Sequence, residues 1–89
     1  IKNKIKGAIT ILLEQKIIHN GGYVCHIEDL VVDKEYRGQN IGKKLVQYAI
    51  QHAKDHNCYK TILNCDVDLE PFYGSLGFEA KNLQMSLYF

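Results

Sequence analysis

The feature that most constrains the fold of this chain is an amphipathic stretch between two runs of strand-like sequence. Apolar residues in Ile41–His56 recur at helical spacing, and lysines and glutamines occupy the opposite side. Val24–Val32 on one side is rich in Val, Ile and Leu, and Lys60–Cys65 on the other is short and apolar at its centre. A strand, a helix and a strand in series predict a parallel strand pair joined by a crossover.

An antiparallel hairpin is expected before this unit. Ala8–Leu13 is an apolar, β-branched run, and Lys16–His19 continues it after two polar residues. The turn signal Asn20-Gly21-Gly22 separates this run from Val24–Val32. The two runs therefore predict a hairpin.

The last third of the chain adds a short helix and a closing strand. Pro71 suits the first turn of a helix over Glu70–Leu76, which Gly77 ends. Leu83–Phe89 alternates apolar and polar side chains, which predicts a strand. At 89 residues the chain is one domain, residues 1–89, of the α/β class with a mixed sheet.

Composition excludes several classes of protein. The hydrophobic share of 46% and charged share of 24% are typical of a soluble globular chain rather than a disordered one. A net charge of +1 provides no broad field for nucleic acid or an anionic membrane surface. No apolar run approaches the ~20 residues that span a bilayer, and no secretory leader is recognisable.

The three cysteines have no C-x-x-C spacing, and with the four histidines they form no metal-ligand pattern. We therefore expect a cytoplasmic protein with no metal, in which the cysteines act as small buried hydrophobes.

A loop with two glycines precedes the long helix, over Arg37–Lys43. Gly38 and Gly42 permit positive φ and close approach of the backbone, and N–H groups at a helix start suit a phosphate or pyrophosphate. The loop matches neither the P-loop nor the dinucleotide fingerprint. An ordinary turn is the alternative interpretation.

Glu28 and Asp29 lie inside the most apolar run. In a regular strand they would point to opposite faces, so one would face the core at a cost of several kcal/mol if charged and unpaired. A β-bulge would re-aim one of them, as happens beside active sites. Alternatively, both are solvated at an exposed strand end.

Tyr73 follows Phe72 in the short helix, and two roles are open to it. It can be a core residue with its hydroxyl bonded to backbone, or a phenol that donates a proton. The four histidines are expected to be structural or solvated, with His19 the exception because it precedes the turn.

Two motifs together resemble the Gcn5-related N-acetyltransferase (GNAT) superfamily: the loop over 37–43 and the later Phe-Tyr-x-x-Leu-Gly-Phe over 72–78. Three further segments resemble, within it, the family of glucosamine 6-phosphate N-acetyltransferases. They are Lys16-Ile17-Ile18-His19, His26-Ile27-Glu28-Asp29-Leu30-Val31-Val32 and Cys58-Tyr59-Lys60. The resemblance covers Lys16 to Phe89.

This resemblance implies a GNAT-type mixed, mostly antiparallel sheet with flanking helices. The family's first strand and helices would precede Ile1, so the chain is expected to be a truncated, C-terminal part of the domain. The implied reaction transfers the acetyl group of acetyl-CoA to the 2-amino group of glucosamine 6-phosphate. The products are N-acetylglucosamine 6-phosphate and CoA, on the route to UDP-N-acetylglucosamine. The implied partner is a second copy, in a homodimer.

The resemblance also implies roles for individual residues. Glu28 or Asp29 would orient the amine, the carbonyl of Asn64 would accept an amine hydrogen, and Tyr73 would meet the departing thiolate. An amide near Leu30 would stabilise the oxyanion, and the Tyr59-Lys60 pair would reach the partner's sugar site. Cofactor binding is implied for Leu30, Val31, Val32, Arg37, Gly38, Gln39, Asn40, Ile41, Gly42, Lys43 and Tyr73, and substrate binding for Lys16, Ile17, Ile18, His19, Glu28, Asp29, Tyr59, Lys60 and Asn64.

Some positions depart from the family pattern. Asn40 stands where many family members have glycine, and asparagine still tolerates a left-handed φ. Asn64 stands where the family has an acidic residue, so a role for its backbone carbonyl is kept and a role for a charged side chain is lost. Leu69 replaces a commonly polar residue near the cofactor. Tyr88 stands where an arginine would help to hold the sugar phosphate, which leaves Lys16 and Lys60 as the remaining cations. Two alternatives therefore remain: acetylation of another small amine or a protein amine, and a non-catalytic acyl-CoA-binding module.

Overall fold

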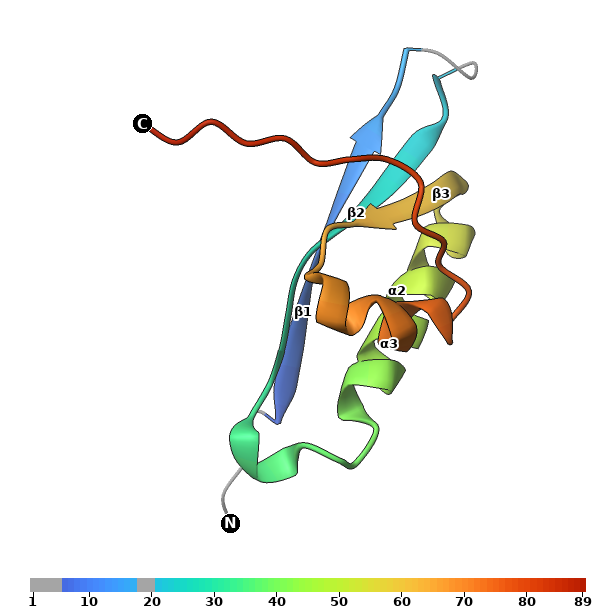
Figure 1. Ribbon diagram of the computed structural model, residues 1–89. Coiled ribbons are helices and arrows are strands. Elements are labelled where there is room, and N and C mark those ends of the chain that lie inside the picture. The colour runs from blue at the N-terminus through green and yellow to red at the C-terminus, as the bar shows by residue number, and fades with distance from the viewer. Residues whose placement is uncertain (1–5, 18–20) are drawn as a thin grey trace.

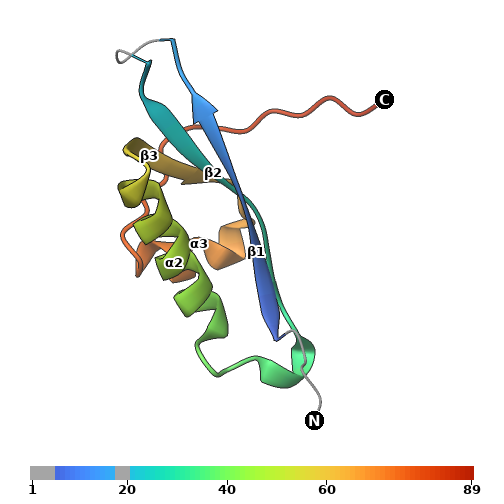
Figure 2. The same cartoon turned by 180° about the vertical axis from the view of Figure 1, so that it is seen from behind.

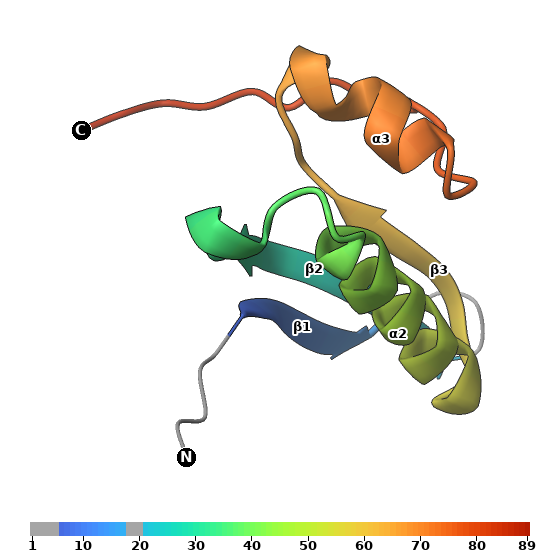
Figure 3. The ribbon, with the colours of Figure 1, turned by 90° about the horizontal axis from the view of Figure 1, so that it is seen from below.

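The computed structural model describes residues 6–17 and 21–89. Its three strands form one sheet in the order β1-β2-β3, and α2 packs against all three of them (Figure 1, Figure 3). No helix in these two ranges is long and apolar enough to cross a bilayer. The elements follow one another as β1 (Gly7–Gln15), β2 (Tyr23–Val32), the 3-10 helix η1 (Lys34–Tyr36), α2 (Ile41–Asp55), β3 (Cys58–Leu63), the 3-10 helix η2 (Val67–Leu69) and α3 (Glu70–Gly74).

The strand pairing confirms both sequence predictions about the sheet. β1 runs antiparallel to β2, and β3 runs parallel to β2 with α2 as the crossover. β1 ends at Gln15, and the backbone N–H of Lys16 then donates to the carbonyl of Gly22 at 2.8 Å. The predicted turn and the extension through His19 include residues 18–20, which lie outside the described residues.

The core forms where α2 and α3 meet one face of the sheet. Ile27 of β2, Val46 and Ala49 of α2, and Tyr73 of α3 make up its buried cluster. Ala53, one turn beyond Ala49, is also buried, so the apolar stripe of the sequence is the buried side of α2. The helix stops one residue earlier than predicted, because His56 caps it and the next residue, Asn57, has a left-handed φ of 60°.

The prediction of a closing strand over Leu83–Phe89 is wrong. This segment has no strand pairing and leaves the body of the molecule (Figure 1, Figure 2). Leu83, Met85 and Leu87 are 84%, 86% and 79% exposed. Alternation of apolar and polar residues specifies only which side chains share a face. A strand forms only when its backbone N–H and C=O groups hydrogen-bond to a neighbouring strand. No strand in 6–17 and 21–89 pairs with this segment.

A small charge cluster links the two strands of the hairpin and predicts a pH effect. The Glu14 carboxylate lies 2.7 Å from His26 Nε2 and 3.2 Å from Lys16 Nζ. The hydrogen bond with His26, then that with Lys16, holds the pKa of Glu14 below its ordinary value of 4.5. Because the folded-state pKa is lowered, the stabilisation is present above pH 4.5 and is lost as pH falls through the lowered value.

We therefore expect the Glu14 carboxyl to titrate below pH 4.5 in the folded chain. Side-chain NMR shifts recorded during acid titration measure this directly. Glu14→Gln should flatten the acid limb of the unfolding free energy. An ordinary titration of Glu14 would contradict the prediction.

Candidate active site

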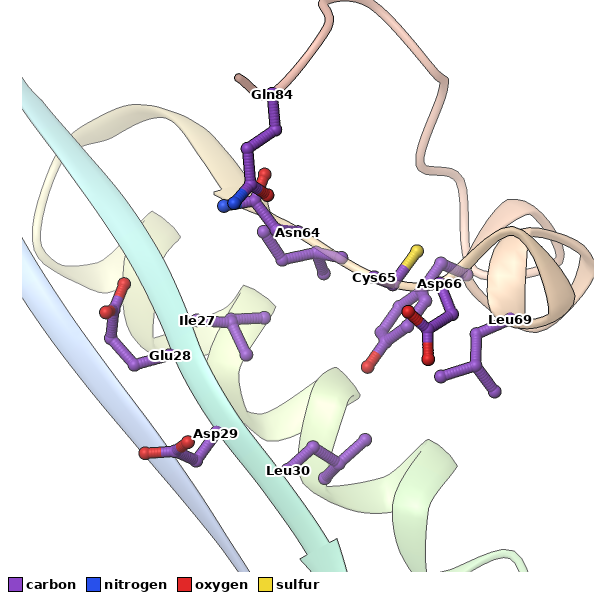
Figure 4. Close-up of a pocket in the computed structure, with 11 residues that line it drawn as sticks. Ile27, Glu28, Asp29, Leu30, Asn64, Cys65, Asp66, Leu69 and Gln84 are labelled. Carbon is purple, nitrogen blue, oxygen red and sulfur yellow. The ribbon is translucent and has the colours of Figure 1, made fainter. Parts of the chain in front are cut away.

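A cavity opens where β2 and β3 part, and we call it the strand opening. The β2–β3 ladder ends at the pair Ile27 and Leu63, and β2 continues to Val32 with β1 as its neighbour. The side of β2 that faces the opening therefore has peptide groups without a strand partner from the described residues, as a bound extended ligand requires. The strand opening has a volume of about 380 Å³ and is lined by Ile27, Glu28, Asp29, Leu30, Leu63, Asn64, Cys65, Asp66, Leu69, Tyr73 and Gln84 (Figure 4).

A β-bulge places the two acidic residues of β2. Thr10 pairs with Asp29 and Ile11 pairs with Ile27, so Glu28 is the additional residue on β2. Glu28 and Asp29 consequently point to the same side of the strand, and the apolar neighbours Ile27 and Leu30 point to the other side (Figure 4). The bulge interpretation is confirmed, and both carboxylates are exposed, as the alternative required. Two adjacent exposed carboxylates suit the binding of an amine.

Tyr73 is a core residue whose hydroxyl is not bonded to the backbone of any described residue, so the structure confirms only part of the first of the two roles. Its side chain is only 8% exposed, and its ring makes edge contacts with Phe72 and Phe78 at centroid distances of 4.9 and 5.8 Å. The Tyr73 hydroxyl has no hydrogen-bond partner among the described residues. Every fully buried side-chain nitrogen or oxygen of these residues has a partner, so the hydroxyl is not fully buried. The hydroxyl therefore meets the strand opening, and the predicted bond to backbone is not formed.

Burial raises the pKa of Tyr73, and the nearby Cys65 thiol raises it further. The phenol consequently stays protonated at neutral pH and is available as a hydrogen-bond donor. Its neighbour Cys65 is exposed and Cys58 is half-buried, so the prediction of buried cysteines holds fully for Cys25 alone.

The glycine loop borders a second cavity at the start of α2, which we call the loop hollow. It has a volume of about 220 Å³ and lies between the end of β2, α2 and α3. The N-cap of α2 makes no side-chain hydrogen bond and the first turn carries no acidic residue, which leaves N–H groups for an anion. The loop hollow is lined by Val32, Tyr36, Arg37, Gly38, Asn40, Ile41, Gly42, Lys43 and Phe72.

Gly42 has no positive φ, so the backbone does not require glycine there. A Cβ at this position would make ordinary contacts of 3.7 Å with Phe72 and Val32, and a longer side chain would extend among the residues of the loop hollow. Gly42 thus keeps the cavity open beside the helix N-terminus. An open cavity beside a helix N-terminus fits a diphosphate, and an ordinary turn does not require such a cavity.

Asn40 takes the left-handed conformation at φ 62° that the sequence allowed for. Asn40→Ala should lower the free energy of unfolding by about 1 kcal/mol, since a Cβ without a local polar group is disfavoured there. Asn40→Gly should retain or raise it. Thermal melts measure both, with an expected fall of about 4–8 °C for alanine. Equal melting temperatures for the two variants would contradict this.

The structure brings only part of the predicted site together. Lys16 pairs with Glu14, Ile17 is 98% exposed, and Lys60 lies 5.8 Å from the ring of Tyr59 on β3. These four predicted substrate residues line neither cavity, and neither do Val31 and Gln39 of the predicted cofactor site. Ile18 and His19 lie outside the described residues.

Besides the apolar Ile27 and Leu63, sequence reasoning missed three residues of the strand opening that carry functional groups. Cys65 and Asp66 lie in the loop after β3, directly beyond Asn64, and loops that follow strands commonly carry functional groups. Gln84 comes from the C-terminal segment, and no pattern in the sequence marks it. Within 6–17 and 21–89 no group of three or more His, Cys, Asp or Glu side chains is arranged for a metal ion.

Comparison with known proteins finds clear relatives. Residues 1–78 match the model of the acetyltransferase (GNAT) family. The chain is 43% identical over 86 residues to a glucosamine 6-phosphate N-acetyltransferase of Arabidopsis thaliana, covering 97% of this chain and 58% of the relative.

Solved structures agree with this match. The crystal structure of the glucosamine-6-phosphate N-acetyltransferase from Arabidopsis thaliana superposes with a TM-score of 0.92 at 43% identity, over 97% of this chain and 58% of that one. An acetyltransferase of Trypanosoma brucei superposes with a TM-score of 0.93 at 38% identity, over 97% and 61%. The chain thus spans somewhat more than half the length of these relatives.

Proposed function

This chain belongs to the acetyltransferase (GNAT) family, and we propose that it transfers the acetyl group of acetyl-CoA to the 2-amino group of glucosamine 6-phosphate. The products are N-acetylglucosamine 6-phosphate and CoA. The observation that carries the choice of substrate is the 43% identity, over nearly the whole chain, to a relative named for this reaction.

The two cavities support a site for acetyl-CoA that runs from α2 to the sheet. Its diphosphate suits the loop hollow, where Arg37 and Lys43 add positive charge to the helix N-terminus. Its pantetheine arm, an extended amide chain, suits the unpaired edge of β2 in the strand opening. Phe72 lines the loop hollow and Tyr73 lines the strand opening, so α3 contributes to both ends of this path.

The residues of the strand opening suit the transfer step. The amine must be neutral when it attacks the thioester carbon, and Glu28 or Asp29 orients it while the Asn64 carbonyl accepts one of its hydrogens. A backbone N–H near Leu30 stabilises the oxyanion, a contribution of about 3–4 kcal/mol for one well-placed donor. As the carbon–sulfur bond breaks, Tyr73 donates a hydrogen bond to the sulfur.

Complete proton transfer from Tyr73 to sulfur is unfavourable. A phenol with an ordinary pKa near 10 is a weaker acid than a thiol near 8.5, so transfer is uphill by roughly 2 kcal/mol. Burial raises the pKa of Tyr73 and makes it a still weaker acid. We therefore assign Tyr73 the stabilisation of the thiolate by hydrogen bonding, with its own proton retained. The nitrogen releases one proton to solvent as the amide forms, and the CoA thiolate takes up one proton from solvent, so the step balances.

An acceptor panel tests the proposed substrate. The protein at full length is incubated with acetyl-CoA and with glucosamine 6-phosphate, glucosamine or a peptide with a free N-terminus, and free CoA is measured. We expect turnover of glucosamine 6-phosphate. Turnover of another amine without it would support the alternative acceptor that Tyr88 suggests. CoA binding by calorimetry without turnover of any amine would support a non-catalytic module.

We also propose that the protein forms a homodimer, with Tyr59 and Lys60 directed to the sugar site of the second copy. The segment over 83–89 supports this, since its row of large apolar side chains is exposed in the single chain. Burial of one such side chain contributes about 1.5–3 kcal/mol. A partner copy would also cover the outer edge of β3, which pairs with no described strand.

Leu87→Asp is expected to convert the dimer to monomers, because it places a charge in the row of apolar side chains. Sedimentation equilibrium of the full-length protein measures the change. Asn82→Asp, which adds the same charge ahead of this row, should remain dimeric. A monomeric parent protein, or a dimeric Leu87→Asp variant, would refute the role of this segment.

A further inference from the structure

Gln84 extends from the C-terminal segment into the strand opening. Its side chain points toward Asn64 at the end of β3, so residues far apart in the chain meet in one cavity (Figure 4). We propose that Gln84 is a specificity-determining residue that hydrogen-bonds a ring hydroxyl of the amino sugar. This inference rests on the proposed acetylation of glucosamine 6-phosphate and adds a contact to it.

The charges around the strand opening determine which part of the substrate meets Gln84. Three acidic residues contribute to its lining, Glu28, Asp29 and Asp66, and the described lining includes no lysine or arginine. The carboxylates of Glu28 and Asp29 lie on the other side of β2 from Ile27 and Leu30 (Figure 4). Such a cavity favours an ammonium group or amine and repels a phosphate. The amine end of the sugar therefore enters the strand opening, and the phosphate stays outside it. The sugar groups next to the amine are neutral hydroxyls, and these are the groups that Gln84 can reach.

A carboxamide is well suited to a hydroxyl, because it offers both an acceptor and donors. Gln84 Nε2 donates to Ser86 Oγ at 3.3 Å, a long bond within its own segment. Its oxygen and second N–H form no hydrogen bond with the described residues. Both remain free to bind a ligand without a strong bond being broken first.

Substrate deletion combined with mutation tests the proposal. The kcat/KM of the full-length protein and of Gln84→Ala is measured on glucosamine 6-phosphate and on its 1-deoxy and 3-deoxy analogues, which lack the hydroxyls on either side of the amine. Gln84→Ala should lose about 3- to 10-fold on the parent sugar, the range for a neutral hydrogen bond. It should lose nothing on the analogue that lacks the contacted hydroxyl, and the KM for acetyl-CoA should not change.

The outcomes separate this inference from the proposed function. An equal loss on all three sugars would indicate a structural effect and overturn the inference, as would no loss on any of them. Gln51→Ala, on α2 and outside the strand opening, serves as the matched control and should match the parent protein. A parent protein that does not acetylate glucosamine 6-phosphate would overturn the proposed function, and this inference with it.

Discussion

Replacing Tyr73 by phenylalanine is expected to lower kcat by about 10²–10³-fold, the range for losing one hydrogen-bond donor to a developing negative charge, and to leave CoA binding intact. The ring packs between Phe72 and Phe78, and phenylalanine preserves both contacts. The hydroxyl alone is removed, and in the structure it bonds to no described residue. The loss therefore falls on the step in which the thiolate departs.

Steady-state kinetics with saturating acetyl-CoA measure kcat, and calorimetry with CoA measures binding. Tyr48→Phe is the matched control, since Tyr48 is 62% exposed on α2, and it should keep full activity. Because burial raises the pKa of Tyr73, any fall in kcat caused by its ionisation should begin only above pH about 10. An unchanged kcat for Tyr73→Phe would remove Tyr73 from the mechanism.

The second large effect is expected from Gly42→Asp, which should weaken CoA binding by about 100-fold or more. The new carboxylate would extend from the first turn of α2 among the residues of the loop hollow and repel a diphosphate there. Two like charges about 4 Å apart repel by roughly 4 kcal/mol near a protein surface. Calorimetric titration with CoA at low and high salt measures the loss, which should shrink as salt screens the charges.

Folding should survive this substitution. Glycine is a poor helix former, and an acidic side chain near a helix N-terminus is favourable, so the melting temperature should hold or rise. Gly42→Asn has nearly the same shape without the charge, and it should lose less affinity with little dependence on salt. Undiminished CoA binding by Gly42→Asp would exclude the loop hollow as the diphosphate site.

Local patterns were sufficient where the physics is local. The apolar stripe of Ile41–His56 predicted the buried side of α2, because helix period alone places those side chains on one face. The conflict between Glu28 and Asp29 indicated either a bulge or two solvated carboxylates, because two adjacent charges in an apolar strand cannot both avoid the core in regular geometry, and the structure has both features. The left-handed Asn40 likewise followed from residue chemistry.

Predictions that needed a distant partner succeeded less well. The segment Leu83–Phe89 had the alternation of a strand, but it pairs with no strand among the described residues. Tyr59 and Lys60 lie on β3 outside both cavities of the single chain, and their role at the sugar site of a second copy stays a prediction. Gln84 carried no motif and nevertheless lines the strand opening.

The sequence by itself determined the antiparallel and parallel strand pairs, the helix start and the family of the chain, because each depends on patterns of residues close together along the backbone. Only the tertiary structure decided where β2 and β3 part, that the Tyr73 hydroxyl meets the strand opening, and that Gln84 lies near Asn64. These depend on how a strand ladder ends and on how α3 packs against it. Both are set by contacts between residues distant in sequence, which no local pattern encodes.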